Sequence, residues 1–291
     1  MHFKAENSWI VLSPIEKRIK EKIEKAGKPL KNWDINIYRG ILTGYNEAFI
    51  IDKETKDKLI AKSSKNAEII RPILRGRDIK RYKADFADLW IIYIPWHFPL
   101  HQDNSIQGAS EIAEMEFKTQ YPDIYNHLYS HKERLSNRNL AETGVRYEWY
   151  ALQRFGSNYM EDFSKQKIVW KRVGSILRFC YEDTGCFALD STCFATGKHI
   201  KYLTLILNSK MGNYLLKDSP KTGTGDLLIS VQAMEPLLIP IPSFEIEGIF
   251  DSLLQQIITN GETDAICQEI NTLVYKIYGL SDDEIDFIEL Q

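Results

Sequence analysis

The sequence of 291 residues predicts an α+β fold in which short strands are mixed with helices. Helical segments with clear start and stop signals stand near both ends of the chain. Short β-type runs separated by turn residues occupy much of the middle. The segments lack the regular strand–helix alternation of βαβ folds. We therefore expect a mixed, short-strand recognition domain, preceded by an N-terminal helix and followed by C-terminal helices.

The first expected helix begins at Ser13-Pro14-Ile15-Glu16, which has the form of a capping box with proline in the first turn. Isoleucines recur every four residues behind it, and Gly27 ends it. Asp52 is expected to cap a second helix that runs through Lys62. A further helical turn is expected over residues 66–74, started or bent by a proline.

Between these helices, "IYRGILTGYNEAFIID" predicts two strands around a glycine corner. Ile35 and Ile37 alternate into the first strand, and residues 48–51 form the second. Gly44 suits the turn, and Asn46 tolerates a left-handed backbone. This segment could be plain hairpin chemistry, or it could present polar side chains to a ligand.

The rest of the chain continues the mixture of short strands and helices. The expected strand runs are 89–95, 167–173, 176–182, 186–197 and 227–243, and the expected helices are 111–136, 201–217, 263–278 and a last one that begins at a second capping box, Ser281 to Glu284.

Charge is unevenly distributed, although the formal net charge is only −3. Residues 62–83 contain eight lysines and arginines against two acids, a local charge of +6. Residues 245–291 contain eleven acids against one lysine, a local charge of −10, so the rest of the chain carries +7. A basic body with an acidic tail is compatible with a polyanionic partner.

Membrane insertion and secretion are not indicated. No apolar run approaches the roughly 20 residues of a membrane helix, and the N-terminus lacks the pattern of a signal peptide. The four cysteines show neither zinc-ribbon spacing nor the density of a disulfide scaffold. We expect buried free thiols in a cytoplasmic protein.

The sequence indicates no catalytic centre. The glycine loop and the Asn/Asp-Pro-Pro-Tyr-type loop of an S-adenosylmethionine-dependent DNA methyltransferase are missing, and no Asp/Glu-x-Lys follows Pro122-Asp123 to form a nuclease metal site. His97 and His101, and His127 and His131, have the four-residue spacing of zinc ligands, but a proline interrupts the first pair and no HExxH motif contains the second. We predict no catalytic and no metal-binding residues.

Arginine and aromatic residues instead concentrate in three segments: "ILRGRDIKRY" at 73–82, "VRYEWYALQRF" at 145–155 and "VWKRVGSILRF" at 169–179, where Lys171 and Arg172 precede Arg178. Arginine forks bind guanine edges and phosphates, and lysines supply charge. The alternative is a set of solvated strand faces whose arginines pair with acids such as Asp78 or Glu148. The three clusters together favour DNA binding.

Ordered blocks along the chain resemble a known family. "PLKNWDINIYRGILTGYNEAFIID", "RPILRGRDIKRY", "EWYALQRF", "KIVWKR", "LTLILNSK", "LIPIP" and "LVYKIYGLSDDEI" are similar, in the same order, to the TaqI-like C-terminal specificity domain of type II restriction–modification methyltransferases. The similarity runs from about Trp9 to the end. A more distant similarity is to the recognition half-modules of type I specificity subunits.

The resemblance implies that the chain recognises double-stranded DNA for a partner that methylates adenine N6, in cis or in trans, without catalytic residues of its own. S-adenosylmethionine is then expected on the parent methyltransferase and no cofactor on this chain. The parent could also cleave DNA. Since base-reading residues change with each target in this family, no motif assigns them. The expected DNA contacts are Arg75, Arg77, Lys80 and Arg81 first, then Arg39, Tyr45, Arg154, Lys171 and Arg172.

We expect an N-terminal helical segment over 1–30, a recognition domain over 31–243, and acidic C-terminal helices over 244–291 that pack on it. A different function remains open: a protein-interaction module that docks on a methyltransferase core through those acidic helices and binds DNA only within the complex. A stand-alone nuclease is the least favoured reading.

Overall fold

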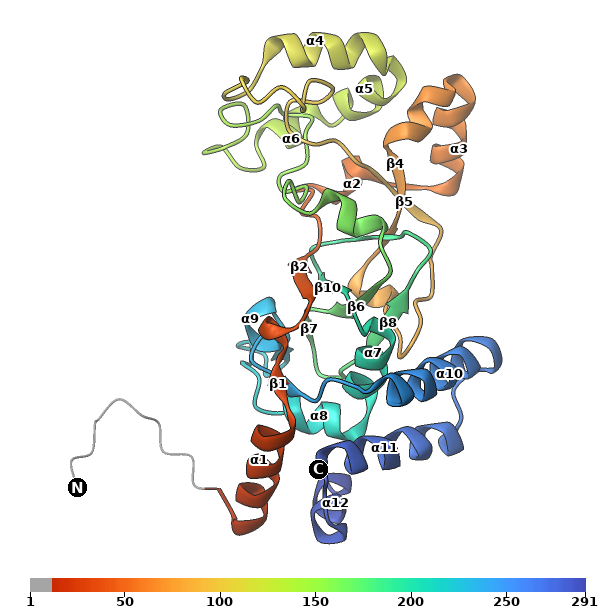
Figure 1. Ribbon diagram of the computed structural model, residues 1–291. Coiled ribbons are helices and arrows are strands. Elements are labelled where there is room, and N and C mark those ends of the chain that lie inside the picture. The colour runs from red at the N-terminus through yellow and green to blue at the C-terminus, as the bar shows by residue number, and fades with distance from the viewer. Residues whose placement is uncertain (1–11) are drawn as a thin grey trace, which may run out of the picture.

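A four-stranded antiparallel sheet lies at the centre of the elongated molecule (Figure 1). The computed structural model describes residues 12–291. The strand order is β2 (Ile35–Arg39), β10 (Thr192–Gly197), β6 (Lys167–Lys171) and β8 (Phe179–Glu182). Successive side chains of a strand point to opposite faces, and both faces of this sheet are covered. Val169 and Phe194 belong to an upper hydrophobic core, whereas Ile168 and Trp170 belong to a lower one.

The upper core contains a second sheet and a group of helices. The sheet has the order β3 (Ile50–Asp52), β5 (Leu89–Ile92), β4 (Ile70–Leu74) and β9 (Phe187–Ala188), with only the β4–β9 pair parallel. The helices are α2 (Asn46–Phe49), α3 (Lys53–Lys62), α4 (Glu111–Gln120), α5 (Pro122–Tyr129) and α6 (Lys132–Ser136). Short 3-10 helices are η2 (Ser64–Ile69), η3 (Gly76–Asp78) and η4 (Met160–Ser164).

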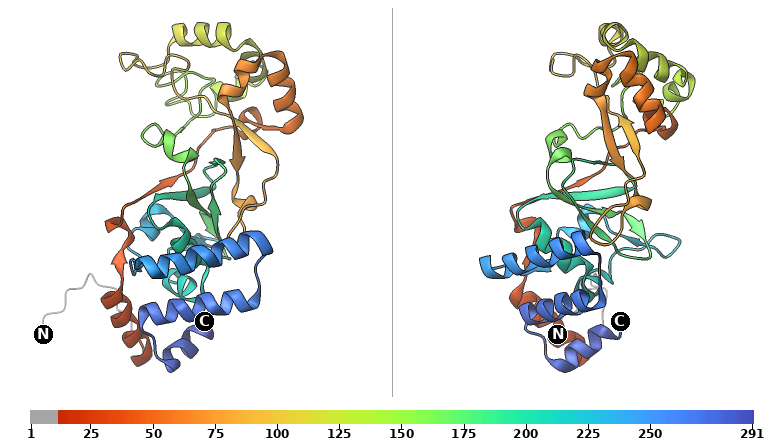
Figure 2. Two further views of the ribbon diagram at one scale, coloured as in Figure 1. Left: turned by 45° about the vertical axis from the view of Figure 1, so that its right-hand side comes forward. Right: turned by 90° about the vertical axis from the view of Figure 1, so that its right-hand side faces the viewer.

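The lower core is mainly helical, and α10 and α11 run beside one another below the central sheet (Figure 2). Its helices are α1 (Pro14–Ala26), α7 (Ile200–Asn208), α8 (Lys210–Leu216), α9 (Val231–Met234), α10 (Phe244–Asn260), α11 (Asp264–Tyr278) and α12 (Asp282–Glu289). After the short 3-10 helix η1 (Leu30–Asn32), the chain enters the central sheet. Two small antiparallel ribbons complete the fold: β1 (Lys28–Pro29) with β12 (Leu238–Ile239), and β7 (Val173–Gly174) with β11 (Leu227–Leu228).

Local end signals in the sequence agree with the structure. The Ser13 hydroxyl accepts from the Glu16 amide while the Glu16 carboxylate accepts from the Ser13 amide, so the predicted capping box forms. Asp52 caps α3 as expected, and a second capping box at Ser281 begins α12. The α+β class is confirmed, because helices and open sheets are mixed without a βαβ repeat.

The expected hairpin around Gly44 is wrong. β2 pairs with β10 in the central sheet, and β3 pairs with β5 in the upper sheet, so the two strands never meet. Gly44 has a positive φ of 77°, which agrees with the expectation that it suits a turn, but Asn46 begins the helix α2 and has no left-handed backbone. The segment therefore carries the chain from one sheet to the other.

Further segments differ from expectation, and the helix expected over 111–136 is divided into α4, α5 and α6. Residues 66–74 form the end of η2 and then strand β4, because Pro72 disfavours helix and the isoleucines of this run are buried in the upper sheet. The helix expected over 201–217 is divided at Ser209, whose hydroxyl caps α8. Residues 227–243 are mostly not strand, and α10 was not predicted, although Ser243 caps it.

No helix within residues 12–291 combines the length and apolarity needed to cross a membrane. In the same range, no three His, Cys, Asp or Glu side chains are grouped so as to hold a metal ion. The free thiols of Cys180, Cys186 and Cys193 are buried, while Cys267 is partly exposed.

Candidate nucleic-acid interface

Arg39, at the end of β2, lies beside the turn that leads into β10. Its Nη2 is 3.2 Å from Oδ2 of Asp190. Gly40 makes this approach feasible, because a Cβ at position 40 would lie 2.2 Å from the carbonyl oxygen of Leu189. The Asp190 amide donates to the Ile41 carbonyl at 2.8 Å, which holds the turn against the strand end. Gly40 thus leaves room beside the strand end, and the backbone of residues 188–189 fills that room.

Two more arginines join Arg39 at this strand end. Arg154 Nη2 donates to the Gly40 carbonyl at 3.1 Å, and its backbone is hydrogen-bonded to Leu42 in both directions. Arg172 directly follows β6, and its amide donates to the Ser191 carbonyl at 3.0 Å. We call Arg39, Arg154 and Arg172 the arginine cluster.

Positive charge in the arginine cluster exceeds negative charge. Burial, then the neighbouring charge of Arg39 and that of Arg172, lowers the pKa of Arg154, while Asp190 opposes the shift. Among the described residues, the buried Nε atoms of all three arginines have no hydrogen-bond partner. Since each guanidinium has five N–H donors, the cluster has more donors than residues 12–291 supply acceptors for. Such an arrangement favours an anionic ligand.

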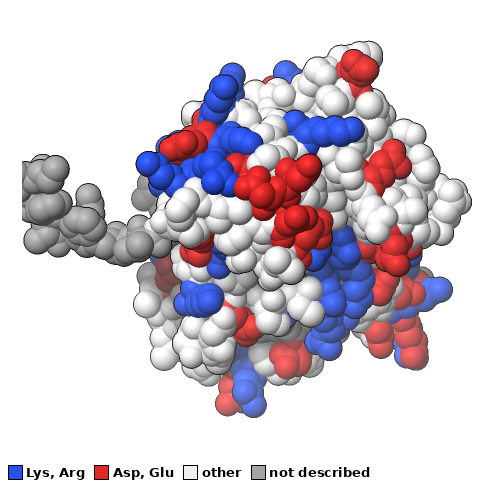
Figure 3. Space-filling view, turned by 90° about the horizontal axis from the view of Figure 1, so that it is seen from below, with Lys and Arg blue, Asp and Glu red and all other residues white. Residues whose placement is uncertain are grey.

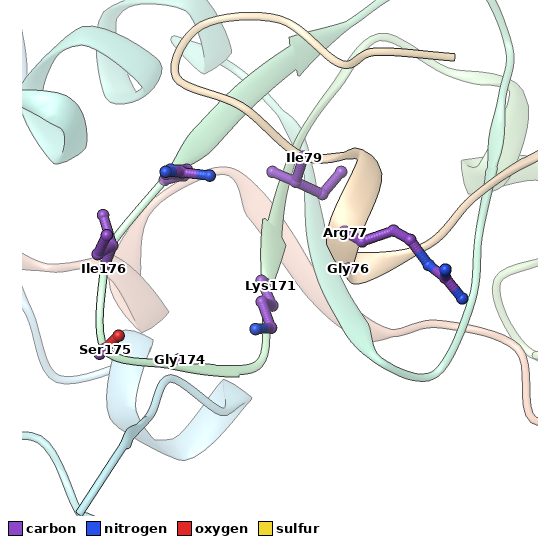
Figure 4. Close-up of a pocket in the computed structure, with 8 residues that line it drawn as sticks. Gly76, Arg77, Ile79, Lys171, Gly174, Ser175 and Ile176 are labelled. Atoms are coloured by element: carbon purple, nitrogen blue, oxygen red, sulfur yellow. The ribbon is translucent and has the colours of Figure 1, made fainter. Parts of the chain in front are cut away.

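A second group of cations surrounds a cavity of about 300 Å³ (Figure 4). Its positively charged members are Arg77 from η3, Lys171 from β6 and Arg178 from the segment before β8. Figure 4 shows Arg77 and Lys171 on neighbouring segments, with residues 174–176 closing another side. Within residues 12–291 none of these three cations forms an ion pair. We call this the cationic cavity.

The arginine cluster and the cationic cavity are adjacent. Lys171 and Arg172 are consecutive, so β6 contributes one residue to each group. The Gly76 amide donates to Ser191 Oγ at 3.0 Å, which ties η3 to the turn that carries Asp190. A Cβ at Gly76 would come within 3.1 Å of Lys171 Cγ, so glycine permits this packing. Segments far apart in the sequence therefore build one cationic region at the end of the central sheet.

The other cations of "ILRGRDIKRY" have partners inside the chain. Arg75 is paired with the buried carboxylate of Asp78, which agrees with the alternative that these arginines pair with acids of the same chain. Lys80 Nζ lies 3.8 Å from Asp85 and donates to the Arg77 carbonyl. Arg81 Nη1 is 2.5 Å from Glu262, between α10 and α11, and its Nη2 donates to the Asn208 carbonyl. Their assignment as DNA contacts stays a prediction.

Tyr45 lies apart from this region. Its ring packs edge-on against His131 with the centroids 5.8 Å apart, near the upper helices. The corner before it is held by Arg138, whose Nη1 donates to the Thr43 carbonyl at 2.6 Å. A Cβ at Gly44 would lie 2.7 Å from Arg138 Cδ, so the glycine accommodates a buried arginine. Sequence reasoning did not identify Arg138.

Acids of the C-terminal segment are paired with bases of the same chain. Arg18 contacts Asp283, and Lys22 Nζ is 2.6 Å from Glu284, so α1 neutralises part of α12. Lys217 also lies 3.5 Å from Glu16 of α1. Figure 3 shows acidic and basic side chains intermixed on the lower face. The acidic tail is therefore no uniform negative surface.

Sequence reasoning missed two members of the cationic region. Asp190 lies inside a predicted strand run, where nothing marked it as a partner for Arg39. Ile176 lies at the cationic cavity although the residue is 62% exposed. The glycine–serine pair before it signals a turn between strands, which could have indicated a surface loop.

The cationic region lies within the part of the chain that matches a known family. The model of the TaqI-like C-terminal specificity domain matches residues 71–235, more than half of the chain. The type II methyltransferase M.MjaIV of Methanocaldococcus jannaschii is 25% identical over 227 residues, which are 76% of this chain and 70% of that protein.

The fold was compared with two solved enzymes. The type IIL restriction-modification enzyme MmeI, in complex with DNA, superposes with a TM-score of 0.56 at 11% identity, over 91% of this chain and 36% of that one. The type IIG restriction endonuclease BpuSI gives a TM-score of 0.44 at 13% identity, over 91% of this chain and 33% of that one. The chain thus spans about a third of each solved enzyme. From the family match, this chain belongs to the TaqI-like C-terminal specificity domains of type II restriction–modification enzymes.

Proposed function

We propose that this chain recognises a sequence in double-stranded DNA for a restriction–modification enzyme. The observation that carries the proposal is the arginine cluster beside the cationic cavity, where Arg39 is the one of the three arginines that pairs with a carboxylate, that of Asp190, among residues 12–291. Phosphodiester oxygens are strong acceptors for cationic donors, and arginine binds phosphate in a bidentate manner. Phosphate contacts position a protein on the duplex, and contacts to base edges provide specificity.

In this proposal the arginine cluster binds the DNA backbone. Arg39, Arg154 and Arg172 are partly buried at a strand end and held by backbone hydrogen bonds, which suits fixed contacts that position the duplex. Arg77, Lys171 and Arg178 form no ion pair within the described part of the chain, so they can contact DNA without breaking internal ion pairs. The family match supports DNA as the polyanion.

The proposed partner is an adenine-N6 methyltransferase catalytic domain, joined to this chain or encoded separately. S-adenosylmethionine belongs on that domain, because the cationic cavity would repel its positively charged sulfonium. This chain supplies recognition and no catalytic residue. The similarity to a type II methyltransferase supports the choice of partner.

We also propose that the recognition domain covers residues 31–243, with 1–30 and 244–291 as accessory helical parts. Contacts support this division in part. α1 pairs with α12 through Arg18 and Lys22, so the two accessory parts pack on one another as well as on the lower core.

Selection from a random duplex pool on the purified chain at low salt, followed by sequencing, tests the proposal. A short enriched motif, with affinity that falls steeply as salt rises, is the expected result. The matched control is the chain with Arg39, Arg154 and Arg172 each changed to alanine, which should retain its fold and lose most of its binding.

Absence of binding would overturn recognition by the isolated chain. The same selection would then be repeated with the catalytic domain added, because an interaction module would bind DNA only in that complex. Pulldown of the catalytic domain with and without residues 244–291 measures docking through the C-terminal helices directly.

A further inference from the structure

An exposed isoleucine lies among the cations of the cationic cavity. Ile176 is 62% exposed, whereas its neighbour Leu177 packs against the lower core. Lys171, Arg178 and Arg77 line the same cavity. A single exposed apolar residue is ordinary on a protein surface. An exposed isoleucine surrounded by cations that form no ion pair within residues 12–291 suits a ligand that is anionic at its edges and apolar at one point.

Strand pairing places Ile176 at the end of a two-stranded ribbon. Gly174 pairs with Leu227, and Val173 with Leu228, in antiparallel register. Residues 175–176 therefore leave the ribbon at the same end as the turn from Thr222 to Gly225. Within residues 12–291, the backbone amides of Ser175 and Ile176 donate to no other group of the chain. This end of the ribbon is open to a partner.

A two-stranded ribbon fits the major groove of B-DNA, and the one apolar feature of the base edges there is the 5-methyl group of thymine. Phosphates flank that groove on both sides. Lys171 precedes the 174–176 loop in the sequence and Arg178 follows it, and both line the cavity, so they are placed to contact the phosphates. The minor groove offers no methyl group, so it would leave the isoleucine without a matching contact.

We propose that Ile176 contacts the 5-methyl group of one thymine in the recognition sequence, and so helps to determine specificity. The inference rests on the proposed function, since it requires that the chain bind duplex DNA at this surface. Lys171 and Arg178 then bind the backbone, and Ile176 distinguishes thymine from the other bases at one position.

The test uses the motif selected on the unchanged chain. Each thymine of that motif is replaced in turn by deoxyuridine, which removes only the methyl group. Dissociation constants are measured for the unchanged chain, Ile176→Ala and the control Val145→Ala. Val145 is 61% exposed and lies in the upper part of the molecule, so it is matched in exposure but distant from the site. Thermal unfolding confirms that each variant is folded.

At one position, the unchanged chain and Val145→Ala should prefer thymine over deoxyuridine by about fourfold, the worth of one buried methyl group. Ile176→Ala should bind both duplexes equally. A motif without thymine, or an equal thymine preference in Ile176→Ala, would overturn the inference and leave DNA recognition standing. Failure of the unchanged chain to bind any duplex would overturn the proposed function, and the inference with it.

Discussion

The guanidinium of Arg75 donates to both carboxylate oxygens of Asp78, from Nε to Oδ2 at 3.0 Å and from Nη2 to Oδ1 at 2.8 Å. Asp78 is buried and also accepts the Arg75 amide at 2.8 Å. Two residues along, Arg77 is exposed and lines the cationic cavity. One short segment therefore contains an arginine that holds the loop and an arginine that is free to bind.

This difference predicts separate effects for two alanine variants. Arg75→Ala should destabilise the fold by about 1–3 kcal/mol, because it leaves a buried carboxylate partly unpaired. Arg77→Ala should leave the unfolding temperature unchanged and weaken DNA binding. Chemical denaturation and fluorescence anisotropy on the same preparations measure both effects. Loss of stability in Arg77→Ala, with none in Arg75→Ala, would contradict this division.

Arg172 provides a prediction about salt dependence. The variant Arg172→Ala should have a slope of log binding constant against log salt concentration that is smaller in magnitude by about 0.9, the value for one phosphate contact. Stability should not fall, because the change also removes a like charge beside Arg154. Arg134→Ala, an exposed arginine on α6, is the matched control and should keep the full slope. An unchanged slope in Arg172→Ala would remove it from the interface.

Arg138 is predicted to matter for stability and not for binding. It donates to the carbonyls of Thr43, Trp149 and Ala151, and its burial lowers its pKa to about 10. Arg138→Met should destabilise the chain by about 3 kcal/mol, because several carbonyls lose their donor together. Arg134→Met should change stability by less than about 0.5 kcal/mol. Equal denaturation midpoints for the two variants would refute this role.

The lowered pKa of Glu284 predicts that the folded state loses stability in acid. Although burial opposes ionisation, hydrogen bonds from Lys22 and from the Ser281 backbone lower the pKa of Glu284 to about 2, from 4.5. The folded state thus holds the proton less tightly than the unfolded state. The stabilisation, about 3 kcal/mol for a shift of this size, is complete above pH 4.5 and is lost as the pH falls toward 2.

Glu284→Gln should abolish that part of the acid dependence and lower the stability at neutral pH. Denaturation midpoints between pH 2 and 7 measure the effect, with Glu269→Gln on the exposed side of α11 as the control. A variant that keeps the full acid dependence would show that other carboxylates are responsible.

Features set by neighbouring residues were predictable. The capping boxes at Ser13 and Ser281, the cap at Asp52 and the end of α1 at Gly27 depend on contacts within four residues, and all are present. The hairpin prediction failed because strand partners are chosen by burial over long distances. β2 pairs with residues 193–197 instead of with the strand that follows it.

The site was predictable in its residue types and not in its groupings. The sequence named Arg39, Arg154 and Arg172 as candidates. Arg39 is more than one hundred residues from the other two, and Arg154 and Arg172 belong to different segments, so the three come together only in the fold, at a strand end. Whether an arginine is free depends on acids that the fold brings near it. Arg75 pairs with Asp78, three residues along the chain, whereas Arg81 pairs with Glu262 from a distant part of the chain.

By itself, the sequence determined the α+β class, several helix ends and the family, because these depend on local patterns and on ordered blocks of similar residues. Only the tertiary structure decided which cations are neutralised and which remain available. Ion pairing acts over a few ångströms in space, and the chain places Asp190 beside Arg39, and Glu284 beside Lys22, across long stretches of sequence.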